Sequence, residues 1–363
     1  MGAANRGPQV TTVSAGELEK LVLAIFAAAG FGTEDAAEIA RALVDADLRG
    51  LPSHGVMLVP MYLARLRAGT VRRGGGAAEI VSDAGGLVVL DAGNALGQLT
   101  SARAVDLAVG RARRFGIGAV AVRNAMHFGA AGYWAARAVA GGCVGVAMSN
   151  TRPMMPAPGG ATPVVGNNPV AVAVPVDDGL PLEFDMATSE AALGKIRLAH
   201  AENRPIPDGW ATDAAGSPTT DAGEAIGGML LPAGGPKGFG LALMIDLLTG
   251  VLGGGGFGAS VRPLYAELDR PNNCAHLFVA IDPRAAVPGF PERAGELARF
   301  VRSSPTAPGA APVRTPGMAK QHTLVRRHAT GIPVPASTLD ALRAEAAGLG
   351  LAWELTLDSE GSP

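Results

Sequence analysis

Cysteine is scarce in this chain: Cys143 and Cys274 are the only two in 363 residues, and both lie in apolar stretches. Their spacing fits no metal site, and a reduced, cytoplasmic setting is favoured over a disulfide framework. The six histidines also lack metal-ligand spacing, so no metal is predicted. His322 and His328 lie in a polar segment and are expected to be solvated.

Clustered positive charge is absent as well. The formal net charge is −2, and the charged residues, 17 % of the chain, are spread along it, so nucleic-acid binding has no electrostatic support. No uninterrupted apolar run is long enough to span a bilayer; the nearest, residues 238–258, contains Asp246 and four consecutive glycines at 253–256. Met1 to Thr12 is polar and has no apolar signal core. We therefore expect a soluble protein.

Apolar residues make up 48 % of the chain, which is ample for one large domain or two moderate ones. Helical periodicity predicts two helices within 14–48, the first capped by Ser14 with Glu17 at capping-box spacing, and a third over 57–67. Beyond these, short β-type runs alternate with helical stretches, which argues for an α/β sheet domain. Strands are expected at 87–90, 117–122, 144–148, 170–174, 182–186 and 276–281, and helices at 100–115, 131–139, 190–198, 240–252, 292–302 and 338–346.

Two histidine-centred motifs, about seventy residues apart, are the most informative feature. In the first, residues 49–55, Ser53 and His54 precede a helix. His54 is a candidate proton donor oriented by Ser53, and the alternative is a helix cap beside a solvated histidine. The second, residues 127–132, follows the strand expected at 117–122, where ligands bind in α/β sheets and backbone N–H groups can hold a phosphate. The alternative there is a tight turn with a packing histidine.

Two further motifs follow apolar stretches. Asp185 ends a strand, so it is either a carboxylate that orients a histidine or a loop cap, and Thr188 or Ser189 can cap the next helix. Residues 232–238 resemble a phosphate loop, although the Ser or Thr that a Walker motif needs after Lys237 is missing. Lys237 before a helix can still meet a pyrophosphate. No G-x-G-x-x-G in a Rossmann context is present.

Together these segments resemble the malate/L-lactate dehydrogenase family that lacks a Rossmann fold. Its relatives include the sulfolactate and ureidoglycolate dehydrogenases and the Δ1-piperideine-2-carboxylate reductases. The matching stretches come in the family's order, extend over roughly residues 15–350, and favour the functional interpretations above. They are residues 47–56, 127–133, 166–169, 185–189 with 194–196, 234–238 and 276–278.

The resemblance implies an α/β (α+β) fold: a non-Rossmann cofactor domain around a mixed sheet, plus a helical domain built from both termini. The implied division is a helical part at 1–75, an NAD(P)-binding α/β domain at 76–289, and a C-terminal segment, 290–363, that returns to the helical domain. Residues 305–316 are rich in Pro, Ala and Gly and form a connector within that segment. The resemblance also implies NAD or NADP as cofactor, and a homodimer with active sites near the interface.

The family's site residues carry over by motif. A catalytic relay would comprise Ser53, His54 and Asp185, with His127 as a second acid/base at the nicotinamide. Leu58, Tyr62 and Asn167 would line the substrate site. The implied cofactor-binding residues are His127, Phe128, Gly129, Ala130, Ala131, Asp185, Met186, Ala187, Thr188, Ser189, Lys195, Pro236, Lys237, Pro316, Gly317 and Met318.

Three positions depart from the family pattern. Leu58 replaces an arginine that grips the substrate carboxylate, Asn167 replaces a threonine, and Met318 replaces the glutamate of Pro-Gly-Glu. A bidentate arginine–carboxylate contact is geometrically specific, and leucine cannot replace it. If another residue holds a carboxylate, Arg49 and Arg65 are the first to test.

The resemblance therefore predicts an oxidoreductase that transfers hydride between nicotinamide and a 2-oxo or 2-hydroxy acid or a related carbonyl, with a histidine moving the proton. One alternative is an imine or larger-ketone reductase with a diverged substrate pocket. Another is a cofactor-binding protein without turnover. The substrate, the direction of the reaction, the choice between NAD and NADP, and the main acid/base histidine stay open.

Overall fold

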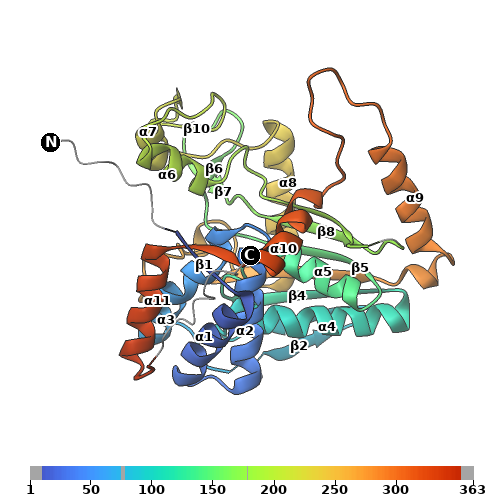
Figure 1. Cartoon of the computed structure of the whole chain (residues 1–363), viewed down its shortest axis with the longest axis horizontal. Helices are drawn as coiled ribbons and strands as arrows, with labels where there is room; N and C mark the ends of the chain where they lie inside the picture. The colour runs from blue at the N-terminus through green and yellow to red at the C-terminus, as the bar shows by residue number, and fades with distance from the viewer. Residues whose placement is uncertain (1–9, 75–77, 178, 353–363) are drawn as a thin grey trace, which may run out of the picture.

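The computed structural model describes residues 10–74, 78–177 and 179–352 (Figure 1). The two ends of this part lie side by side. Strand β1 (Val10–Val13) pairs antiparallel with β13 (Ile332–Pro335). Helices α1 (Ala15–Ala28), α2 (Thr33–Leu48) and α3 (Val59–Arg67) share one hydrophobic core with β13 and α11 (Ala336–Gly348). Between α2 and α3 the chain forms two short 3-10 turns, Pro52–His54 and Val56–Leu58.

A mixed seven-stranded sheet forms the middle of the molecule, in the order β2-β3-β4-β12-β5-β8-β9. Only β3 and β4 are parallel; the other neighbours are antiparallel, so this is no doubly wound parallel sheet. The predicted combination of a mixed sheet with helices is confirmed. The strands are β2 (Glu79–Asp83), β3 (Leu87–Asp91), β4 (Ile117–Ala125), β5 (Val144–Ser149), β8 (Val170–Val174), β9 (Leu182–Met186) and β12 (Cys274–Ile281).

Helices cover both faces of this sheet. Helices α4 (Gly97–Phe115) and α5 (Ala131–Ala140) pack on one face, where Gly118 and Gly145 let them approach closely. A Cβ at Gly118 would lie 2.2 Å from the carbonyl oxygen of Ala108 on α4. The other face meets the end of α8 (Pro236–Asp246), which continues into a π-helical turn, Leu247–Val251. Because strand side chains alternate, Ala121 faces this second layer while Val120 faces α4.

A smaller cluster lies above the sheet in Figure 1, at the upper left and next to α8. Its core includes Met155, Ile196 and Leu230. The elements are β6 (Met155–Pro156), β7 (Pro163–Val165), α6 (Leu193–Ala201), β10 (Ala211–Thr212), β11 (Pro218–Thr219) and α7 (Ala222–Gly227). Helix α9 (Phe290–Arg302) lies at the opposite end of the molecule from α11, and α10 (Met318–Thr330) returns along the sheet edge at β9 (Figure 1).

Several local predictions are confirmed. Ser14 accepts a hydrogen bond from the Glu17 N–H (3.2 Å), although the Glu17 side chain pairs with Lys20 instead of closing the capping box. Cys143 and Cys274 are unpaired and buried. His322 and His328 are exposed. Among the described residues, no helix is long and apolar enough to cross a membrane.

Other local predictions were wrong. Helix α6 begins at Leu193 after the cap residue Ala192, so neither Thr188 nor Ser189 caps it. The Ser189 hydroxyl instead donates to the Ala191 carbonyl oxygen, and its backbone pairs with Pro232. Helix α8 starts at 236, earlier than expected, with Pro236 in its first turn. Strand β2 and helix α10 were not predicted at all, because both are largely polar or exposed.

Candidate active site

A buried carboxylate holds the loop that carries Ser53 and His54. Asp47, near the end of α2, accepts a hydrogen bond from the Val56 N–H through Oδ2 (2.7 Å). Gly55 packs directly on this carboxylate: a Cβ there would lie 2.2 Å from Asp47 Oδ2. Burial raises the pKa of Asp47 to about 7, while the Val56 N–H and Arg327 oppose that rise. The conformation of this loop therefore depends on the Asp47 carboxylate and on the absence of a side chain at Gly55.

The two histidine motifs meet. The rings of His54 and His127 stack with centroids 5.7 Å apart and an interplanar angle of 28°. Ser53 Oγ lies 2.9 Å from His54 Nδ1. Burial lowers the pKa of His54, the Asp185 carboxylate raises it, and the Lys320 ammonium lowers it. Asp185 and Lys320 are therefore close enough to His54 for their charges to shift its pKa.

The hydrogen bonds around His127 assign its tautomer. The Gly129 N–H donates to His127 Nδ1 (3.4 Å), so this nitrogen is an acceptor and the Tyr62 hydroxyl donates to it at 2.9 Å. Gln98 Nε2 in turn donates to Tyr62 Oη (2.9 Å). Burial raises the pKa of Tyr62 and, with His54 and His276 nearby, lowers the pKa of His127 to about 3. His127 is therefore a neutral imidazole whose proton lies on Nε2.

The backbone next to His127 is fixed from three sides. The His127 N–H donates to Asn272 Oδ1 (3.1 Å). The preceding carbonyl, of Met126, accepts from Nε2 of the buried His276 (3.1 Å). Phe128 stacks on His276 with centroids 4.5 Å apart, so its ring belongs to the sheet core. His276 thus positions the second motif.

Asp185 lies on β9 among other charged groups. Its Oδ2 is 2.7 Å from Lys320 Nζ on α10. Two residues earlier, Glu183 Oε2 pairs with Arg49 Nη1 at 2.5 Å, and Arg49 Nε also pairs with Asp45 at 2.5 Å. Glu183 Oε1 is buried without a hydrogen-bond partner. Gly132 on α5 covers both carboxylates, because a Cβ there would lie 2.4 Å from Glu183 Oε1 and 2.9 Å from Asp185 Oδ2.

A cavity of about 260 Å³ opens beside this charged cluster. Sequence reasoning did not select Lys320 or Glu183. Two features of the sequence could have pointed to them. Glu183 is two residues from Asp185, so both side chains lie on the same face of a strand, and Lys320 is close in sequence to the Pro316-Gly317 motif. The cavity is lined by Glu183, Phe184, Asp185, Arg314, Thr315, Pro316, Gly317, Ala319 and Lys320.

The segment after Asp185 adjoins the start of α8. The Thr188 N–H donates to the Asn167 carbonyl oxygen (3.0 Å), and the Thr188 carbonyl accepts from the Ala233 N–H (2.9 Å). Gly234 and Gly235 follow with φ of 63° and 62°, and a Cβ on either would meet open space. Pro236 and Lys237 are exposed in the first turn of α8. The structure thus joins Asn167, the 185–189 segment and the 232–238 loop.

The remaining predicted residues are exposed, buried in a core or already paired. Lys195 is exposed on α6, with its ammonium 5.9 Å from the centre of the Trp210 ring. Leu58 is fully buried in the helical core. Neither arginine named as a substitute clamp is free: Arg49 is paired with Asp45 and Glu183, and Arg65 donates to four backbone carbonyls, those of Pro263, Leu264, Ala266 and Arg270.

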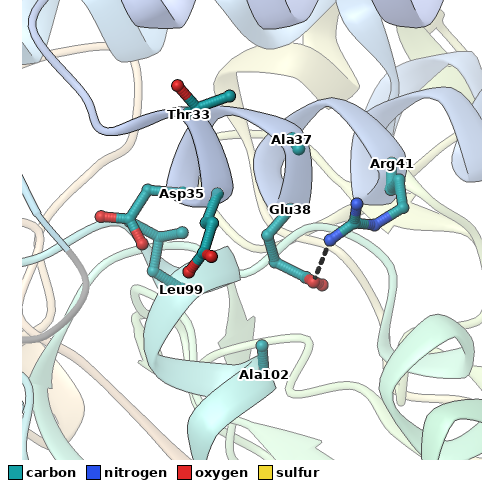
Figure 2. Close-up of a pocket in the computed structure, with 8 residues that line it drawn as sticks. Thr33, Asp35, Ala37, Glu38, Arg41, Leu99 and Ala102 are labelled. Atoms are coloured by element: carbon teal, nitrogen blue, oxygen red, sulfur yellow. Dashed lines mark hydrogen bonds and ion pairs between the residues drawn. The ribbon is translucent and has the colours of Figure 1, made fainter.

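A second cavity, of about 440 Å³, lies between the start of α2 and α4. Figure 2 shows Thr33, Asp35 and Glu38 on one side and Leu99 and Ala102 on the other. Glu38 pairs with Arg41 at 2.8 Å. No predicted site residue lines this cavity, so it is separate from the histidine pair.

Comparison with known proteins shows the family to which this chain belongs. The family model described as malate/L-lactate dehydrogenase matches residues 13–343. The chain belongs to the malate/L-lactate dehydrogenase family. It is therefore a dehydrogenase, and the resemblance drawn from the ordered motifs is confirmed.

Two characterised relatives and one solved structure illustrate what the chain is similar to within this family. The chain is 37 % identical over 334 residues to a (2R)-3-sulfolactate dehydrogenase (NADP(+)) of Chromohalobacter salexigens, covering 92 % of this chain and 98 % of that one. It is 36 % identical to a ureidoglycolate dehydrogenase (NAD(+)) of Escherichia coli O157:H7, covering 84 % and 87 %. The solved Δ1-piperideine-2-carboxylate reductase from Pseudomonas syringae pvar. tomato is 31 % identical with a TM-score of 0.83, covering 93 % and 100 %.

The buried position of Leu58 generates a prediction about the missing arginine. Leu58→Arg should lower the free energy of unfolding by about 3 kcal/mol or more, because an unpaired charge would be desolvated in the helical core. Leu58→Met, which conserves volume, should cost less than about 1.5 kcal/mol. Urea unfolding of both variants measures this difference.

The same unfolding experiment can be repeated in the presence of a small 2-oxo acid. If position 58 faces the substrate carboxylate, pyruvate or oxaloacetate should stabilise Leu58→Arg more than it stabilises the wild type, because the ligand pairs with the new charge. Equal stabilisation of both proteins by the acid would remove Leu58 from the substrate site.

Proposed function

We propose that this dehydrogenase uses NAD or NADP to interconvert a 2-hydroxy acid and its 2-oxo acid, with proton transfer at the His54–His127 pair. The observation that carries this proposal is the stacking of the two imidazoles beside the Asp185–Lys320 pair. The names of the sulfolactate and ureidoglycolate dehydrogenases support a 2-hydroxy acid as the substrate class.

The residues present fit a dinucleotide. The Gly234–Gly235 turn is open where side chains would stand, and it leads into the N-terminus of α8, an eleven-residue helix. Such a terminus presents unpaired N–H groups to a phosphate. Thr188 Oγ1 is buried without a hydrogen-bond partner next to this turn. We infer that Thr188, Ser189, Pro236 and Lys237 would hold the cofactor, which supplies the hydride acceptor or donor at its nicotinamide.

Proton transfer follows from the histidine tautomers. His127 is neutral, so its Nε2–H can donate a hydrogen bond to the substrate oxygen without carrying a charge. His54 can take the proton, since Ser53 holds its Nδ1 and leaves Nε2 for exchange. Asp185 stabilises the protonated form of His54. His54 is thus the main acid/base and His127 the electrophile in this proposal.

A cyclic imine or larger ketone is the second candidate substrate class. The Δ1-piperideine-2-carboxylate reductase supports it, because that relative carries this activity in its name. Leu58 also supports it, since no arginine stands at that position to bind a small carboxylate. Nicotinamide oxidation measured with a panel of 2-oxo acids and cyclic imines separates the two classes, and absence of turnover with every member would leave only cofactor binding.

We also propose the domain division and the homodimer. The separate hydrophobic clusters support a helical domain formed by residues 1–75 with the proposed C-terminal segment 290–363, which joins it through β13 and α11, and an NAD(P)-binding domain at 76–289. Helix α9, at the start of that segment, lies away from the helical domain (Figure 1). The unpaired cysteines support a reducing, cytoplasmic location.

An exposed apolar face on α8 and its π-helical turn supports association with a second copy. It consists of Leu241, Leu243, Met244, Leu247, Leu248, Val251 and Leu252.

His54→Ala and Asp185→Asn should each lower kcat by about 10²–10⁴-fold, because each removes a group from proton transfer. The dissociation constant of the cofactor, measured by nicotinamide fluorescence, should change far less. His200→Ala on α6, an exposed histidine away from the site, is the control and should keep wild-type kcat. Near wild-type turnover in either site variant would exclude that residue from the mechanism.

Lys237→Ala should weaken cofactor binding by about 10–100-fold, the value of a hydrogen bond to a charged group. Isothermal titration of the full chain with NADH and with NADPH measures this change and decides which cofactor is preferred. Lys20→Ala, on the exposed surface of α1, serves as the matched lysine control. Equal affinity in the wild type and Lys237→Ala would place the dinucleotide elsewhere.

Met244→Glu with Leu248→Glu should convert the proposed dimer to a monomer, because charge would enter the apolar face of α8 and its π-helical turn. Light scattering after size exclusion gives the mass. Leu297→Glu with Phe300→Glu places the same charges on exposed apolar positions of α9 and should leave the dimer intact. A monomeric wild type, or a dimer that survives both pairs of substitutions, contradicts the assignment.

A further inference from the structure

Lys320 is the charged group of α10 nearest to the proposed proton relay. Its Nζ lies 2.7 Å from Asp185 Oδ2 and 3.4 Å from the Asp185 carbonyl oxygen. The two side chains are only 25 % and 11 % exposed, so water screens the pair incompletely. Gly317, with φ of 88°, lets the start of α10 approach β9: a Cβ there would lie 2.8 Å from the Glu183 carbonyl oxygen.

Lys320 is not needed to dock α10. Gln321 donates from the same helix to the Pro181 carbonyl oxygen before β9, and Arg327 donates to the Asp47 carbonyl oxygen at the end of α2. These two contacts fasten the helix at both ends of the site. The described contacts of the Lys320 ammonium, by contrast, both go to Asp185. Its charge also lowers the pKa of Glu183 and of His54, but its closest contact is with Asp185.

We propose that Lys320 is a positioning residue that sets, through Asp185, the pH at which His54 exchanges its proton. This inference rests on the roles proposed above for His54 and Asp185. An ammonium in contact with Asp185 offsets most of the negative charge that the carboxylate presents to the imidazole. His54 then gives up its proton at lower pH than it would beside an uncompensated aspartate.

The other charges around His54 do not replace this effect. The charges that act on His54 are Asp185 on β9 and Lys320 on α10, and the neutral His127, from the turn after β4, stacks on its ring. Glu183 lies two residues from Asp185 on β9. Glu183 is already paired with Arg49. Removal of the Lys320 charge leaves Asp185 as the uncompensated anion near His54, so the pKa of His54 should rise.

The test compares Lys320→Gln, which can keep a hydrogen bond to Asp185 without the charge, with Lys320→Arg, which keeps the charge. Lys320→Met removes both, and Lys20→Met on α1 is the surface control. Histidine Cε1–H resonances of the full chain are titrated by NMR, with His54 assigned from the signal missing in His54→Gln. Six histidines make this spectrum tractable. The pH profile of kcat/KM is recorded for the same proteins.

We expect the pKa of His54 to rise by about 1 unit in Lys320→Gln and Lys320→Met, the lower end of the effect of a neighbouring charge. Lys320→Arg and Lys20→Met should stay within about 0.3 unit of wild type, well below that effect. The acid limb of kcat/KM should move to higher pH by the same amount as the NMR titration. An unchanged His54 titration in both uncharged variants overturns the proposal, as does a raised KM for the hydroxy acid without any shift of the titration.

The two readouts separate this inference from the proposed function. A shifted His54 titration with an unshifted kcat/KM profile would support the link from Lys320 to His54 and overturn the assignment of His54 as the acid/base. A shifted profile with an unshifted titration would overturn the link itself, because the activity change would then come from another group.

Discussion

The ion pair between Arg49 and Glu183 joins the two parts of the molecule on which the site depends. Arg49 follows the last residue of α2, just before the Ser53–His54 loop, and Glu183 lies on β9, two residues before Asp185. Their side chains are only 12 % and 1 % exposed, and the charged atoms are 2.5 Å apart. Any slip of the helical part against the sheet would separate the pair and leave a buried charge without a partner, which is costly. The pair therefore fixes the register in which His54 meets His127.

The charges around this junction form two ion-paired groups. Arg49 is paired with Asp45 and Glu183, and Lys320 is paired with Asp185. Each cation lowers the cost of removing its carboxylates from water, whereas the like charges of Glu183 and Asp185 add to that cost, and Asp185 raises the pKa of Glu183. At His54 burial is the largest influence and lowers the pKa, while Asp185 and Lys320 act on it in opposite directions. A lowered pKa favours the neutral imidazole, which the proposed role of His54 as a base requires.

Periodicity in the sequence predicted the elements whose apolar residues face a core, such as α1, α2, β4 and β5, within a few residues. It also predicted β9 at its observed bounds, but the alternation of apolar Leu182, Phe184 and Met186 with Glu183 and Asp185 does not tell which face of that strand is buried. The structure buries Glu183 and leaves Phe184 43 % exposed, because Gly132, Arg49 and α10 cover the polar face. Helix α10 itself has no fully buried residue and no apolar stripe that a pattern could detect. The motifs located the two histidines, but their stacking depends on docking between distant elements, which spacing does not encode.

The three departures from the family pattern lie in different surroundings. Leu58 is in the helical core, Asn167 adjoins the Thr188 backbone, and Met318 accepts the Thr315 N–H through Sδ (3.2 Å). Loss of an arginine at 58 removes a positive charge from the α3 side, while Arg314 and Lys320 line the cavity beside Asp185. Arg314 and Lys320 therefore supply positive charge beside Asp185 from the C-terminal part of the chain, whereas position 58 supplies none. If the histidine pair and Asp185 form the active site, as proposed, an anionic substrate would meet the field of these two cations there, so that its recognition would rest on residues other than those that move the proton.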